Sequence, residues 1–160
     1  MRDLLRSQMD LFISLFSTFT IILTDRVTKI FFNDLLLPGE SLPLIKNIIH
    51  MTLVHNTGIA FGLFKDHGVV FIVIPIIAII LLIFNIYYYR KNNKALSHTY
   101  IVAFSLILGG AIGNLFDRIV YGHVIDFIDF RVWPVFNIAD SAITIGALMI
   151  AIKCFQLTAK

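Results

Sequence analysis

The stretch HVIDFIDFRVWPVFNIADS, residues 123–141, places the carboxylates Asp126, Asp129 and Asp140 among aromatic and aliphatic residues. Removing an ionised carboxylate from water is costly unless the group is paired, hydrogen-bonded or protonated. Three acids in so apolar a segment therefore require a structural or a chemical explanation. A long apolar segment follows Asn137, so the same stretch is expected to mark where a loop meets a membrane helix.

The rest of the chain is unusually apolar. Of its 160 residues, 58% are hydrophobic and only 14% are charged, and the mean hydropathy is +0.88. A soluble domain carries about 25% charged residues, so we expect an integral membrane protein with a single domain, residues 1–160. The basic residues are scattered, which disfavours nucleic-acid binding. The single cysteine, Cys154, excludes an internal disulfide.

Four apolar segments are long enough to cross a membrane, which takes about 20 helical residues. We expect these spans at about 11–32, 69–89, 99–119 and 138–157. Four spans put both termini on one side of the membrane. The compact basic connection RKNNK at 90–94 and basic residues near the termini make that side cytoplasmic by the positive-inside rule.

The outer connections are then residues 33–68 and 120–136. In the first of them, IIHMTLVHN at 48–56 is rich in β-branched residues and runs into the turn signal Asn56-Thr-Gly. This pattern predicts a short strand, in a small β element on the outer membrane surface. The following AFGLF, residues 60–64, is too short to classify by its periodicity.

Polar residues occur near the ends of the predicted helices. Asp25 and Lys29 are one helical turn apart, and they are expected either to pair for their own burial or to orient a substrate. In the third span, Gly109 and Gly113 have the spacing that lets helix backbones approach closely.

Further along the third span, Gly110, Asn114 and Asp117 share one helical face, and Arg118 follows. Asp117 and Arg118 could instead form a pair at the membrane interface. Either arrangement places a cation near the acids of the third connection, where it sets their local field.

Asn137 and Asp140 have the spacing of a helix N-cap and its N3 acid, so a capping box explains Asp140 but not Asp126. If the two acids converge, they cannot both ionise cheaply, so one keeps a proton and the other activates water. The start of the fourth helix favours ionised Asp140, which leaves Asp126 as the proton carrier. Asp129 competes as a partner, but we interpret it as a solvated loop acid.

Taken in order, five blocks resemble the lipoprotein signal peptidases, also called signal peptidase II. They are TDRVTK at 24–29, HNTGIAFG at 55–62, GGAIGNLFDR at 109–118, VIDFIDF at 124–130 and FNIADS at 136–141. The resemblance implies a membrane protein of four transmembrane helices, with a small antiparallel β-sheet cradle on the outer surface of the bacterial inner membrane. One departure is Arg26, where the family commonly has Gln.

The resemblance also implies an aspartyl endopeptidase that cleaves diacylglyceryl-modified prolipoproteins on the amino side of the lipidated cysteine. Asp126 and Asp140 match the catalytic dyad. The matching supporting positions are Asp25, Lys29, Asn56, Gly110, Asn114, Arg118 and Asn137. The expected partners are the prolipoprotein and membrane lipid, and the mechanism requires no oligomer.

No metal or organic cofactor is expected, because the five histidines show no metal-binding spacing beyond a weak His123-x-x-Asp126 pair. A proton-coupled transporter is an alternative, but it predicts acids near the bilayer midplane and repeated halves. A non-enzymatic assembly protein, packing through GGAIG, would leave the outer acids without a role.

Overall fold

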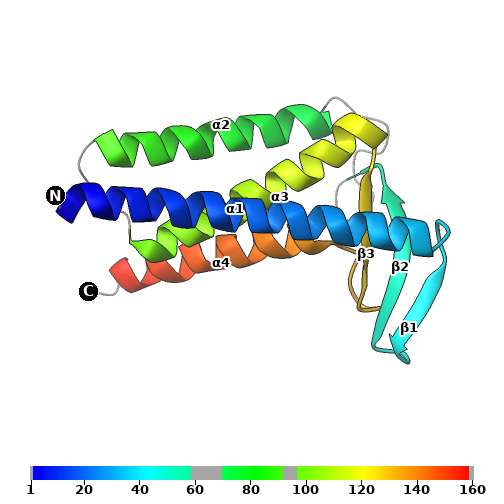
Figure 1. Ribbon diagram of the computed structural model, residues 1–160. Helices are drawn as coiled ribbons and strands as arrows, with labels where there is room; N and C mark the ends of the chain where they lie inside the picture. Colours follow the sequence, from blue (N-terminus) through cyan, green and yellow to red (C-terminus); the bar gives the residue numbers. More distant parts are fainter. Residues whose placement is uncertain (1, 59–69, 92–96, 159–160) are drawn as a thin grey trace.

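A computed structural model describes residues 2–58, 70–91 and 97–158 (Figure 1). The helices are α1 (Arg2–Leu35), α2 (Val70–Lys91), α3 (His98–Tyr121) and α4 (Ile138–Thr158), and the strands are β1 (Ser41–Ile45), β2 (Ile49–Asn56) and β3 (Val124–Asp129). The segment 60–64 and most of the basic connection 90–94 lie outside the described residues. The helices run alongside one another, and the sheet stands at one end of them.

Three of the described helices are long and apolar enough to cross a membrane: Gln8–Leu35 of α1, all of α3, and Ile138–Gln156 of α4. The remaining predicted span coincides with α2, a helix of 22 residues that contains Pro75. That α2 also crosses stays a prediction. The start of α1 and the end of α4 lie together, at the end of the helices away from the sheet (Figure 1).

Glycines on α3 let α1 approach its backbone. A Cβ added to Gly109 would lie 2.9 Å from the Cβ of Ile21, and one added to Gly113 would lie 2.6 Å from a carboxylate oxygen of Asp25. A side chain at Gly109 would require α1 to move, and one at Gly113 would displace the carboxylate of Asp25. The close helix packing that the spacing of these glycines predicts is therefore confirmed.

Gly110 faces α4 instead, and its replacement by alanine is expected to destabilise the protein. The added methyl group would collide with the Ala139 carbonyl oxygen and lie 2.8 Å from a side-chain carbon of Ile143. Such overpacking costs about 1–3 kcal/mol, whereas alanine in an open helical position gains about 0.5–1 kcal/mol over glycine. Thermal unfolding in detergent distinguishes destabilisation from stabilisation, and a raised unfolding temperature for Gly110→Ala would contradict this close contact.

The strands form one antiparallel sheet in the order β1-β2-β3. Its register pairs Ser41 with Thr52 and Val54 with Asp126, with an irregularity between Met51 and Val54. The predicted strand at 48–56 is confirmed as β2.

Our interpretation of 120–136 as a loop is wrong for β3. This strand is buried along nearly its whole length, including both of its acids, Asp126 and Asp129. It therefore lacks the alternation of apolar and polar residues that identifies a half-exposed strand. An apolar cluster of Leu36, Leu53 and Ile125 joins the end of α1 to the sheet.

Candidate active site

Asp126 and Asp140 come from different elements and meet at Asn137. Asp126 lies in the middle of β3 and is 1% exposed, and Asp140 lies in the first turn of α4. The side-chain Nδ2 of Asn137 donates to Asp126 Oδ1 at 2.7 Å, and its backbone N–H donates to Asp140 Oδ2 at 3.3 Å. One asparagine therefore holds both carboxylates.

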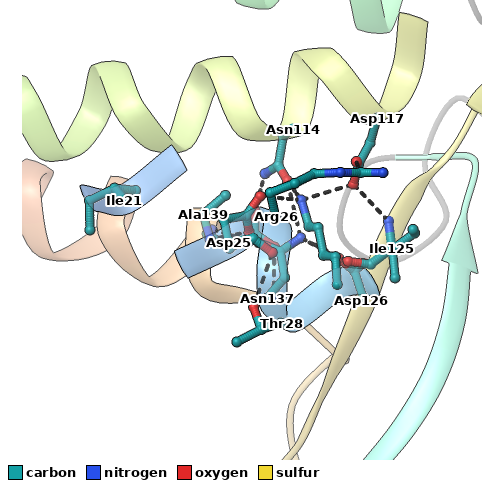
Figure 2. A network of polar contacts seen from close by, with 12 residues as sticks. Ile21, Asp25, Arg26, Thr28, Asn114, Asp117, Ile125, Asp126, Asn137 and Ala139 are labelled. Atoms are coloured by element: carbon teal, nitrogen blue, oxygen red, sulfur yellow. Dashed lines mark hydrogen bonds and ion pairs between the residues drawn. The ribbon is translucent and has the colours of Figure 1, made fainter. Parts of the chain in front are cut away.

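Asn114 of α3 is hydrogen-bonded to Asp140 and to Asn137, and Figure 2 shows Asn114 and Asn137 in this network. Its Nδ2 donates to Asp140 Oδ1 at 2.7 Å, and its Oδ1 accepts from Lys29 Nζ at 2.9 Å and from Asn137 Nδ2 at 3.1 Å. Because an ammonium group can only donate, the contact with Lys29 fixes the amide with its NH₂ group toward Asp140.

Asn56, at the end of β2, binds the second oxygen of Asp126. Its Nδ2 donates to Asp126 Oδ2 at 2.8 Å, while its Oδ1 accepts the backbone N–H of Gly58 at 3.0 Å. Burial and, after it, the charge of the nearby Asp140 together raise the pKa of Asp126 to about 7, although the hydrogen bonds from Asn56 and Asn137 oppose the shift. At neutral pH, Asp126 is therefore a carboxyl group poised between its two protonation states.

The predicted capping box is confirmed. Asn137 precedes α4, its Oδ1 accepts the backbone N–H of Asp140 at 2.9 Å, and Asp140 Oδ2 accepts the N–H of Asn137 in return. While Oδ2 of Asp140 takes part in the capping box, its Oδ1 accepts a hydrogen bond from Asn114. Capping and convergence with Asp126 are thus compatible for this acid.

Lys29 lies at the centre of a buried ionic cluster. It is 0% exposed, and its Nζ lies 2.8 Å from Asp25 Oδ2 and 2.9 Å from Asp117 Oδ2. Asp25 Oδ1 accepts the backbone N–H of Ala139 at 2.9 Å, which ties α1 to the first turn of α4. The predicted pairing of Asp25 with Lys29 is confirmed, and it also positions the helix that carries Asp140.

Asp117 contributes more to the site than its sequence pattern indicated. It is 0% exposed, which favours the alternative of a buried polar face shared with Asn114 over a pair at the membrane interface. One of its oxygens pairs with Arg26 Nη1 at 3.0 Å, and the other accepts the backbone N–H of Ile125 at 3.2 Å (Figure 2). Asp117 therefore fastens β3 to α3 at the residue before Asp126, and the guanidinium of Arg26 supplies a second cation to this cluster.

Arg118 and Gly110 complete the set of residues expected from the sequence. Arg118 Nη1 donates to the Asn114 carbonyl oxygen at 3.4 Å, and the guanidinium interacts electrostatically with both Asp126 and Asp140. Gly110 lies against α4 at Ala139 and Ile143.

Asp129 does not belong to this network, and the interpretation of a solvated acid is wrong. Its residue is 5% exposed, and its carboxylate accepts hydrogen bonds from Thr52 Oγ1 and the backbone of Arg131, each at 2.7 Å. Burial alone would raise the pKa of Asp129, but these hydrogen bonds and the Arg131 charge outweigh it and lower the pKa. Asp129 is therefore an ionised structural acid.

Helices long enough to cross a membrane, with a buried network of acids and amides beside a small sheet, define a membrane protein with an enclosed polar site. Among the described residues, no group of three or more His, Cys, Asp or Glu side chains could hold a metal ion. The family model described as signal peptidase (SPase) II matches residues 17–156. The chain therefore belongs to the signal peptidase II family of peptidases, which confirms the resemblance.

Related proteins align with this chain over most of their length. The lipoprotein signal peptidase of Halothermothrix orenii is 41% identical over 136 residues, which cover 85% of this chain and 90% of that protein. The lipoprotein signal peptidase of Pseudomonas putida is 38% identical over 145 residues, covering 85% and 82%. A bacterial membrane enzyme solved at 2.3 Å superposes with a TM-score of 0.82 at 33% identity, covering 91% of this chain and 88% of that one.

Proposed function

We propose that this chain is an aspartyl endopeptidase that removes the signal peptide from diacylglyceryl-modified prolipoproteins, on the amino side of the lipidated cysteine. The observation that carries the proposal is the meeting of Asp126 and Asp140 on Asn137 in a buried site. The relatives named lipoprotein signal peptidases support the choice of substrate.

The same proposal places the protein in the bacterial inner membrane, with four spans, both termini in the cytoplasm and the site at the outer leaflet. The start of α1 and the end of α4 lie at one end of the helices and the sheet at the other, which supports this orientation (Figure 1). Asp126 and Asp140 lie at the sheet end, whereas a proton-coupled transporter would carry its acids near the midplane.

In the reaction, ionised Asp140 removes a proton from a water molecule while the oxygen of that water attacks the scissile carbonyl carbon. Protonated Asp126 gives its proton to the carbonyl oxygen, which forms a neutral tetrahedral diol. Asp140 then passes its proton to the leaving nitrogen as the carbon–nitrogen bond breaks, and Asp126 recovers a proton from the diol. The products are a carboxylic acid and an amine, and both acids return to their starting states.

The surrounding residues favour an ionised Asp140 beside a protonated Asp126. The N-terminus of α4 and two hydrogen-bond donors, Asn114 and the Asn137 backbone, favour the ionised form of Asp140. Lys29 holds Asn114 in the required orientation, and Arg118 adds a positive charge near both acids. Gly110 lets α4 come close enough to α3 for Asn114 to reach Asp140.

The pH dependence of kcat/KM follows from the protonation states. Because the reaction needs protonated Asp126, whose pKa is about 7, we expect kcat/KM to fall as the pH rises through about 7. Asn56→Ala removes a hydrogen bond that lowers the pKa of Asp126, so the alkaline limb should move to higher pH in this variant. Steady-state cleavage rates across a pH series measure the alkaline limb in the wild type and in Asn56→Ala, and a limb at the same pH in both would contradict the role of Asn56.

The proposed substrate is tested with the purified full chain in lipid and a synthetic prolipoprotein, with and without diacylglyceryl on its cysteine. We expect cleavage of the lipidated form alone, with mass spectrometry locating the cut on the amino side of that cysteine. Equal cleavage of both forms, or a cut elsewhere, would contradict the proposal.

A further inference from the structure

The segment between β3 and α4 presents two neighbouring apolar side chains to the outside of the protein. Val132 is 91% exposed and Trp133 is 63% exposed. We call these two residues the apolar tip. Exposed large apolar groups are ordinary when they are scattered singly, whereas contiguous apolar patches mark contact surfaces. Val132 has the highest exposed fraction among the large hydrophobic residues that the structure describes.

The apolar tip is held in a fixed conformation. Arg131, directly before it, has φ +66°, a left-handed backbone that costs an L residue roughly 1–2 kcal/mol. Asp129 holds this conformation, because its carboxylate accepts both the Arg131 backbone N–H at 2.7 Å and Arg131 Nη1 at 3.0 Å. Thr52 of β2 donates to the same carboxylate, so the sheet itself anchors the turn.

The apolar tip also lies between two helices that are long and apolar enough to cross a membrane. α3 ends at Tyr121, and α4 begins at Ile138, five residues after Trp133. The apolar tip is therefore joined, within a few residues of chain, to the first turn of a helix that is apolar enough to cross a membrane. Tryptophan favours the membrane–water interface, where its ring is half buried among the headgroups.

The positive charge beside the apolar tip is also suited to the membrane–water interface. The Arg131 side chain is 48% exposed, so part of its guanidinium remains open to the outside of the protein. Arginine binds phosphate strongly, and anionic lipid headgroups attract basic residues at the membrane surface.

We propose that the Val132–Trp133 tip inserts into the lipid interface on the sheet side of the membrane, with Arg131 on lipid phosphate groups. Asp129 is then a positioning residue that aims the tip. The insertion would hold the segment that joins the strand of Asp126 to the helix of Asp140 at the membrane surface. The partner is the bilayer itself and not the substrate.

Trp133 is the only tryptophan in the chain, so intrinsic fluorescence reports directly on the apolar tip. The full chain is placed, without substrate, in phosphatidylcholine and phosphatidylglycerol vesicles whose lipids carry bromine either near the headgroup or near the chain end. We expect the strongest quenching from bromine near the headgroup and only weak quenching by the water-soluble quencher acrylamide.

Two variants separate the effect of the Asp129 hydrogen bonds to Arg131 from the effect of the Arg131 charge. Asp129→Asn weakens the hydrogen bonds to Arg131 that fix the conformation of the tip. Quenching of Trp133 by brominated lipid should therefore decrease, and its quenching by acrylamide should increase. Arg131→Gly keeps the positive φ without strain and removes the guanidinium, so lipid quenching should persist while its dependence on phosphatidylglycerol content is lost.

Strong acrylamide quenching of the wild type with no effect of brominated lipid would overturn the proposal. So would lipid quenching that arises only after a prolipoprotein is added, because the substrate would then be the partner. Both outcomes are read from the wild type and do not depend on the folding of any variant. Neither depends on catalysis, so failure here is distinguishable from failure of the proposed peptidase activity.

Discussion

Replacing Asp126 or Asp140 with asparagine is expected to lower kcat for prolipoprotein cleavage by roughly 10²–10⁴-fold, the usual contribution of a positioned acid or base. Asparagine is close to aspartate in shape, but it cannot take a proton from water or return one to the carbonyl oxygen. Because the two acids act in the same step, the double variant should be little worse than the more severe single variant.

The matched control is Asp34→Asn, which removes the same charge from an exposed position in the last turn of α1. Its kcat should stay close to that of the wild type. Thermal unfolding of each variant shows whether the fold persists. A folded Asp126→Asn or Asp140→Asn variant that keeps its kcat would contradict the division of roles between the two acids.

Replacing Lys29 with methionine is expected to destabilise the protein by about 3–5 kcal/mol, the range for breaking a buried ion pair by removing one partner. Methionine fills most of the same space, so the loss comes from charge and not from a cavity. Asp25 and Asp117 would remain buried without the cation that lies within 2.9 Å of each. Reversible unfolding in detergent micelles measures this change in free energy.

Asp117→Asn provides the complementary test for Lys29. In the double variant, one of the two carboxylates that lose their contact with Lys29 is removed together with the lysine, so the destabilisation should be smaller than the sum of the single changes, although Arg26 still pairs with Asp117 in Lys29→Met. Lys46→Met, in the exposed turn between β1 and β2, is the control for loss of a lysine. A Lys29→Met variant as stable as the wild type would show that the buried cluster does not hold the helices together.

Local patterns in the sequence were sufficient for the helices and for pairs of residues within one element. The apolar segments at 11–32 and 138–157 were expected to form helices, since an apolar segment of about 20 residues satisfies its own backbone groups within a membrane as a helix. Asp25 with Lys29, and Asn137 with Asp140, interact across one helical turn, so their spacing alone predicted both pairs.

The remaining part of the site depends on contacts between distant segments. The hydrogen bond from Asn56 to Asp126 joins residues 70 positions apart, and the bond from Lys29 to Asn114 joins residues 85 apart. No local periodicity encodes such contacts. Asp129 was misinterpreted and Asp117 was left open for the same reason, because their partners on β2 and α1 become neighbours only when the chain is folded.

The most direct test of the pairing between the two acids is a titration of Asp126 itself. Infrared difference spectroscopy on protein with ¹³C-labelled aspartate, with Asp126→Asn used to assign the band, follows its protonation across a pH series. We predict a midpoint near 7 in the wild type and a lower midpoint in Asp140→Asn, because that variant removes the neighbouring like charge. A midpoint near the ordinary value of 3.8, or one that Asp140→Asn leaves unchanged, would show that the two carboxyl groups do not act as a pair.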